Sequence, residues 1–233
     1  MPLYPETPLY RAITTGAFPI IVSLPRHDLD LARAAFEAGA GAIKVHLNAF
    51  HRASGTRFGS YAAERPFLEQ LAKLGAPMLV MAGQETVPTL NELNALADLG
   101  FEGFNVYVDH LQPHMLQSRL RPMPALSSTS TDADTMRLAA IPGAMLEASI
   151  MDFADYGTAL TPADIARYAH IAGQSSAPVI APSQKKFTPA DMPALRGSGM
   201  AALLLGVIVT GTTPKDMLSR VAAFTKAPGA AVR

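Results

Sequence analysis

The chain has 233 residues, 49% of them hydrophobic, and its 19 Lys and Arg residues balance 19 Asp and Glu residues. A net charge of zero excludes a global electric field that would attract nucleic acid or an anionic membrane, so any positive site must be local. The absence of Cys excludes disulfides, thiolate nucleophiles and Cys-based metal sites.

The N-terminal segment lacks a basic stretch followed by an apolar one, so we expect no signal peptide. No apolar run reaches the roughly 18 residues of a membrane span. We therefore expect a cytoplasmic protein that binds neither membranes nor nucleic acid. A homo-oligomeric assembly is compatible with the sequence.

The first half of the chain alternates short apolar runs with helical patterns that end in Gly. Strands are predicted at residues 19–24, 42–48, 77–81 and 103–109. Helices are predicted at residues 28–39, 65–75 and 93–99, with a short one at most over 112–119. Residues 49–64 show no apolar period and form the longest predicted loop.

The second half repeats the same unit. Strands are predicted at residues 121–127, 144–151, 178–181 and 201–205. Helices are predicted at residues 131–140, 161–172 and 191–195, and a last one begins at 213. Thr-Pro-x-Asp at 161, 188 and 213 supplies an N-cap, a Pro at the first helical position and an acid near the positive helix end.

Eight strands and about eight helices in strict alternation predict parallel βαβ units. A closed barrel and an open doubly wound sheet both satisfy this pattern. An open sheet would more often have a Gly-rich loop after its first strand, and here the chain reads SLPRHD. We therefore predict a single (β/α)8 TIM barrel over residues 1–233.

Polar residues share one face of several predicted strands. In a barrel, the face that points to the axis can be polar near the C-terminal mouth. The residues expected at the axis or the mouth are Ser23, Lys44, His46, Asn48, Asn105, Tyr107, Asp109, Glu147, Ser149 and Ser183.

Lys44 and Glu147 lie on the second and sixth predicted strands, which face each other across a barrel. A desolvated Lys beside a carboxylate can act as a general acid or base, or form an imine with a carbonyl substrate. The alternative is a structural ion pair without chemistry. His46 and Asp109 are candidates for secondary proton transfer, or else a hydrogen-bonded core His and a strand-end cap.

The remaining candidates are ligand-binding residues. Asn48 and Asn105 are expected to orient a substrate. Arg52 and Arg57 lie in the long loop, which could cover an anionic substrate or stay solvated. His46, Asp109, Glu147 and Asp152 could converge on a metal, but no HxH or HExxH spacing supports one. We expect no metal.

The strongest local motif follows the last predicted strand. Gly206 comes directly after the apolar run 201–205, and a Gly there lets backbone N–H groups approach an anion. In (β/α)8 barrels, the loops after strands 7 and 8 and a short extra helix frequently bind phosphate. We therefore expect residues 183–224 to form a C-terminal phosphate-binding module.

This segment resembles the ribulose-phosphate-binding barrel superfamily, through FTPAD at 187–191 and GMAALLLGVI at 199–208. It is similar in particular to the N-acetylmannosamine-6-phosphate 2-epimerase, thiamine-phosphate synthase and keto-deoxy-phosphogluconate aldolase types. The resemblance implies that amides near Ser183, Gln184, Gly206 and Val207 hold a phosphate. Aldolases of this group have Glu on strand 2 and Lys on strand 6, the reverse of Lys44 and Glu147, so their chemistry is not transferred.

The functional expectation is an isomerase, epimerase or lyase acting on a small phosphorylated, sugar-like substrate without a redox cofactor. Lys44 would be the acid–base or imine-forming group and Glu147 its partner. The alternative is a binding or regulatory barrel that keeps the anion site and uses the ion pair as structure.

Overall fold

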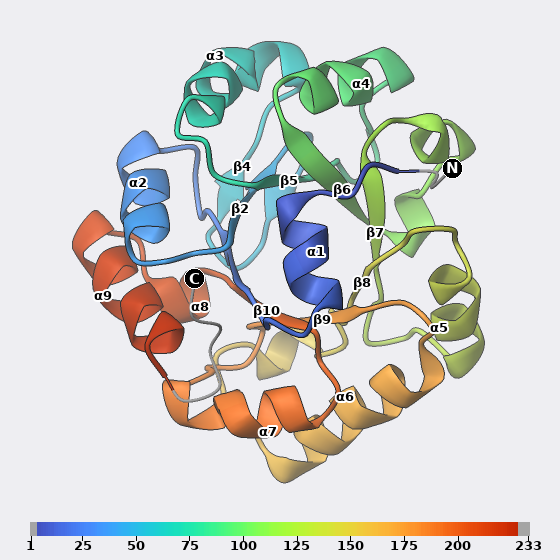
Figure 1. The fold of residues 1–233 in the computed structure, drawn as a ribbon, viewed down its shortest axis with the longest axis vertical. Helices are drawn as coiled ribbons and strands as arrows, with labels where there is room; N and C mark the ends of the chain where they lie inside the picture. The colour runs from blue at the N-terminus through green and yellow to red at the C-terminus, as the bar shows by residue number, and fades with distance from the viewer. Residues whose placement is uncertain (1–3, 228–233) are drawn as a thin grey trace.

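The computed structural model describes residues 4–227 and contains a closed barrel of eight parallel strands (Figure 1). Around the ring the order is β1-β10-β9-β8-β7-β6-β5-β2. The bounds are β1 (Ile20–Ser23), β2 (Ala42–His46), β5 (Met78–Met81), β6 (Phe101–Tyr107), β7 (Arg121–Ala125), β8 (Leu146–Glu147), β9 (Val179–Pro182) and β10 (Ala202–Leu205). The predicted (β/α)8 barrel is confirmed, and the open sheet is wrong because β1 pairs with both β2 and β10.

The helices that follow the strands form the outer ring (Figure 1). They are α2 (Leu29–Glu37), α3 (Tyr61–Ala72), α4 (Leu90–Asp98), α5 (Asp132–Ala139), α6 (Pro162–Gln174), α7 (Met192–Gly197) and α9 (Pro214–Thr225). Short 3-10 turns are η1 (Val108–His110), η2 (Pro113–Gln117), η3 (Phe153–Asp155) and η4 (Pro189–Asp191). Capping boxes at Thr89, Thr131 and Thr161 fix the starts of α4, α5 and α6.

One end of the barrel is closed by a helix that the sequence pattern did not predict. This helix, α1 (Pro8–Thr14), lies across the ring in Figure 1. Its Leu9 and Ile13 are buried against the apolar floor of the barrel. The floor residues are Ile21, Ala42, Leu79, Met123, Met145, Ile180, Ala202 and Leu204. Seven residues are too few to show a helical period, which is why α1 escaped prediction.

Alternation along the strands explains why a polar layer follows this floor. Ala42 belongs to the floor, and successive side chains of a strand point to opposite faces. Lys44 and His46 therefore follow Ala42 on the inner face of β2, while Ile43 and Val45 pack in the larger core toward the helices. The inner face thus changes from apolar to polar toward the C-terminal ends of the strands.

Two segments differ from their predictions. The strand predicted at 144–151 pairs only at Leu146–Glu147, because the Ser149 and Ile150 amides bond to carbonyls two residues earlier and turn the chain out of the ladder. The predicted loop 49–64 contains a small hairpin of β3 (Phe50–His51) and β4 (Thr56–Arg57). Its backbone leaves β2 at Asn48, whose φ of 48° is left-handed.

Candidate active site

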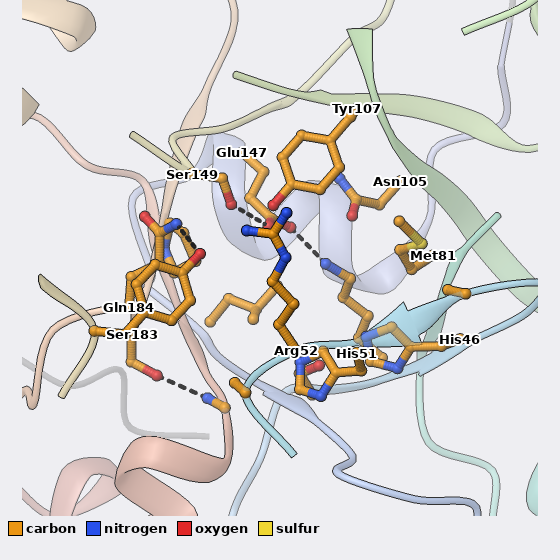
Figure 2. Close-up of a pocket in the computed structure, with 18 of the residues that line it drawn as sticks. His46, His51, Arg52, Met81, Asn105, Tyr107, Glu147, Ser149, Ser183 and Gln184 are labelled. Atoms are coloured by element: carbon orange, nitrogen blue, oxygen red, sulfur yellow. Dashed lines mark hydrogen bonds and ion pairs between the residues drawn. The ribbon is translucent and has the colours of Figure 1, made fainter. Parts of the chain in front are cut away.

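A cavity of about 370 Å³ opens at the C-terminal ends of the strands (Figure 2). Its inner part is lined by Ser23, Lys44, Asn105, Glu147 and Ser149. Its mouth is lined by residues of the β3–β4 hairpin and of the loops after β8, β9 and β10. This is the end of a (β/α)8 barrel where active sites form.

An ion pair spans the inner part of the cavity. β2 and β8 lie opposite each other in the ring, and Lys44 Nζ is 2.6 Å from Glu147 Oε2. The two residues are only 4% and 5% exposed. The Ser149 hydroxyl donates to the other carboxylate oxygen, Oε1, at 3.0 Å. Both carboxylate oxygens therefore have a donor, and the ammonium keeps N–H groups available for a ligand.

Aromatic rings surround the next residue on the inner face of β2. The His46 ring stacks on Phe58 with centroids 4.8 Å apart and contacts the His51 ring at 4.7 Å. Its Nδ1 is buried without a hydrogen-bond partner in residues 4–227. Burial, reinforced by His51 and Lys44, holds the pKa of His46 well below its usual range. His46 is therefore a neutral imidazole at physiological pH.

This neutral His predicts a pH dependence of stability. Below pH 6.5 the unfolded chain protonates His46 while the folded chain does not, so the free energy of unfolding falls as the pH falls. One such group contributes a slope of at most about 1.4 kcal/mol per pH unit. His46→Asn should flatten the acid limb by that amount in urea unfolding at pH 5, 6 and 7. Exposed His170→Asn is the control, and an unchanged slope in His46→Asn would contradict the assignment.

The β3–β4 hairpin places a second cation over the cavity. Arg52 extends across the mouth in Figure 2, and its guanidinium lies 5.2 Å from the ring centroid of Phe153, in the loop after β8. Arg52 forms no ion pair with any residue between 4 and 227. Its charge lowers the pKa of Tyr107 and Tyr156, although burial raises both more strongly. The mouth therefore has an aromatic wall with a guanidinium against it.

The loop after β10 contributes backbone amides to the opposite part of the mouth. A one-turn helix, α8 (Val207–Thr210), starts directly after Gly206. The Gly206 amide donates to Ser183 Oγ at 2.7 Å. The amides of Val207 and Ile208 have no acceptor within residues 4–227, and both residues line the cavity. Two donors are thus free for an anion. Of the four residues whose amides the resemblance implied, only Val207 keeps a free one, because the amides of Ser183, Gln184 and Gly206 already donate to Leu204 O, Pro182 O and Ser183 Oγ.

The side chain of Gln184 holds the loop after β8 in place, so its amide group is already engaged within the protein. Its Oε1 accepts from the Met151 amide at 3.1 Å, and its Nε2 donates to the Tyr156 hydroxyl at 2.6 Å. Gln184 nevertheless lines the cavity together with Ser183. Asn105 also lines it, with its Nδ2 donating to the Met123 carbonyl at 2.7 Å.

Of the residues predicted for the site, the structure brings Lys44, His46, Asn105, Glu147, Ser183, Gln184, Gly206 and Val207 to one cavity. Three others do not line it. The left-handed turn at Asn48 directs the chain away from β2, and Asp109 is exposed on η1. Arg57 is exposed on β4, with its guanidinium 5.3 Å from the Phe50 ring.

Cavity residues that sequence reasoning did not assign come mainly from the loops. They include Phe50, His51, Phe153 and Tyr156, whereas Arg52 belongs to the loop that was expected to cover an anionic substrate. No strand period marks these residues, and the only available signal was the density of His and Arg in 49–64. In residues 4–227 no three His, Asp or Glu side chains gather in an arrangement suited to a metal ion. The same residues include no helix with the length and apolarity to cross a membrane.

The fold has close counterparts among solved structures. Tryptophan synthase from Mycobacterium tuberculosis matches with a TM-score of 0.72 and 14% identity, over 97% of this chain and 98% of the other. Thiamine phosphate pyrophosphorylase from Pyrococcus furiosus matches with a TM-score of 0.65 and 11% identity, over 91% and 95%. The tryptophan synthase A-subunit from Pyrococcus furiosus matches with a TM-score of 0.64 and 10% identity, over 90% and 97%.

At these identities the likeness establishes the fold alone. The (β/α)8 barrel fold that the resemblance of the C-terminal segment implied is therefore confirmed. No family model and no curated protein matches the sequence at a significant level.

Proposed function

We propose that this protein is an enzyme that moves a proton at a carbon next to a carbonyl group of a small phosphorylated, sugar-like substrate. An isomerase and an epimerase begin with removal of this proton, and a lyase of the retro-aldol type ends with its reverse, protonation of the enolate carbon that C–C cleavage leaves. The observation on which the proposal rests is the Lys44–Glu147 ion pair, at 2.6 Å, on the inner wall of an open cavity. Buried charges without a task are costly, and this pair faces the space that a ligand would fill.

The chemistry follows from the charges of the two groups. The Glu147 carboxylate accepts the proton from carbon, and the C–H electron pair forms a carbon–carbon double bond while the carbonyl π pair moves to oxygen. The Lys44 ammonium donates a hydrogen bond to that oxygen as it becomes negative. Return of the proton to carbon completes the exchange. No redox cofactor is needed, because no electrons leave the substrate.

An anionic group on the substrate is supported by the donors at the mouth. The cations of Lys44 and Arg52 outweigh the single carboxylate of Glu147, since His46 is neutral. The free amides of Val207 and Ile208 lie at the same opening. Backbone amides and a guanidinium are well suited to phosphate oxygens.

Val207→Pro tests the anion position by removing one amide hydrogen. Pro fits the first helical position, and Gly206 already has the extended backbone (φ −107°, ψ −175°) that precedes Pro. A charge-assisted hydrogen bond of about 1.5–3 kcal/mol predicts binding of glycerol 3-phosphate that is about 10- to 150-fold weaker by calorimetry. Val207→Ala retains the amide and should bind normally. Equal binding by both variants would show that the Val207 amide does not bind the phosphate.

Solvent hydrogen exchange tests the reaction class without knowledge of the product. Each compound of a panel of phosphorylated aldoses, ketoses and keto acids would be incubated with the protein in D₂O and followed by proton NMR. We expect loss of the signal of the proton next to the carbonyl in at least one compound. Borohydride trapping of the same mixture separates an imine on Lys44 from simple proton transfer. Absence of exchange across the panel would refute the proposed function.

A further inference from the structure

The β3–β4 hairpin brings an imidazole to the cavity that the proposed chemistry has not used. His51 lines the cavity, and its ring lies beside that of His46 with centroids 4.7 Å apart (Figure 2). Its Nδ1 is 2.7 Å from Ser54 Oγ. Within residues 4–227 no partner engages Nε2, so this nitrogen is the one left for a ligand.

The hydrogen bonds around Ser54 indicate which nitrogen holds the proton. The His51 carbonyl already accepts the amides of Ser54 at 3.2 Å and Gly55 at 2.9 Å. The Ser54 hydroxyl is 3.5 Å from that carbonyl and 2.7 Å from Nδ1. The hydroxyl hydrogen is therefore better directed at Nδ1, which makes Nδ1 the acceptor and leaves the ring hydrogen on Nε2.

The ring also stays uncharged over the physiological range. Burial and the Lys44 charge lower the pKa of His51 to about 4, against an opposing effect of Glu147. The charged groups that act on His51 are thus Lys44 on β2 and Glu147 on β8. His46, beside the His51 ring, is itself neutral. A neutral imidazole N–H suits an enolate oxygen, because it stabilises the charge without transferring a proton irreversibly.

We propose that His51 is a catalytic residue whose Nε2–H donates a hydrogen bond to the oxygen that becomes negative when Glu147 takes the proton from carbon. The Lys44 ammonium reaches that oxygen from the inner wall, and His51 reaches it from the hairpin. Ser54 is the positioning residue that selects the Nε2–H form. This inference rests on the proposed function, and it predicts that the hairpin contributes to the chemistry as well as to binding.

A matched pair of substitutions tests this role on the full-length protein. His51→Leu removes the donor, and His51→Gln keeps an N–H near the place of Nε2. With any compound that exchanges, His51→Leu should lower kcat about 10²- to 10³-fold with little change in KM, the usual loss for one oxyanion donor. His51→Gln should retain at least ten times the kcat of His51→Leu. Exposed His170→Asn serves as the control and should match the wild type.

A second measurement is independent of turnover, and its main readout needs only the wild-type protein. The ¹⁵N chemical shifts of His51 in the wild type should report a neutral, Nε2-protonated ring from pH 5.5 to 8, and Ser54→Ala should shift the ring toward a mixture of tautomers. An Nδ1-protonated ring or an imidazolium at pH 7 would overturn the inference. So would full exchange activity in His51→Leu, which would leave the proposed function standing. If the wild type exchanges no compound, the proposed function fails and His51 loses its role with it.

Discussion

Lys44→Met should lower kcat for the exchange reaction by about 10²- to 10⁴-fold, the range that a positioned acid or base contributes. Binding of glycerol 3-phosphate should weaken far less than kcat falls, because the amides of Val207 and Ile208 and the Arg52 guanidinium remain. The variant also leaves the buried Glu147 carboxylate with Ser149 as its hydrogen-bond donor. Breaking a buried ion pair in this way costs about 3–5 kcal/mol, so stability must be measured beside activity.

The double variant Lys44→Met, Glu147→Gln separates chemistry from stability. It removes both charges at once, and the free energy of unfolding should return toward the wild-type value because no uncompensated charge stays buried. Activity should stay as low as in Lys44→Met. A double variant that regains both stability and turnover would identify the pair as structural, and the barrel would then be better described as a binding or regulatory protein.

Arg121→Met should lower the free energy of unfolding by about 3 kcal/mol without lowering the activity of the folded protein. Arg121 is 5% exposed at the closed end of the barrel, and its guanidinium lies 3.4 Å from the ring centroid of Tyr10, on α1. It donates to the carbonyls of Gly143 at 2.8 Å and Pro5 at 3.0 Å. Loss of these charged hydrogen bonds and of the cation–π contact accounts for the expected destabilisation.

Urea unfolding of Arg121→Met and Arg119→Ala would check this prediction. Arg119 is two residues away and more than half exposed, where it pairs with Asp98. Such a surface pair contributes at most about 1 kcal/mol, so Arg119→Ala should stay close to the wild type. Equal losses in the two variants would mean that Arg121 does not anchor α1 to the barrel.

The sequence predicted the barrel and its inner face because both depend on periodic patterns. The alternation of Ala42, Lys44 and His46 with Ile43 and Val45 indicated which side chains point to the axis, and the structure places them there. The position of Glu147 opposite Lys44 followed from strand count alone. These features are local, repeated and tied to burial, which sequence patterns record directly.

The mouth could not be predicted in the same way, because its residues are positioned by contacts that are distant in sequence. Arg52 lies over Phe153, about a hundred residues later in the chain, and Gln184 fixes Tyr156. Asn48 and Asp109 were assigned to the site by extending strand alternation beyond the point where β2 and β6 end. The left-handed residue at 48 and the 3-10 turn at 108–110 end that alternation, and neither leaves a periodic signal.

The position of α1 also determines from which end of the barrel a ligand can enter. Among residues 4–227, Leu9 and Ile13 block the barrel axis below the cavity. A ligand would therefore enter and leave through the mouth at the C-terminal ends of the strands. Under the proposed function, a product would leave past the β3–β4 hairpin, where Arg52 crosses the opening, before the next substrate binds.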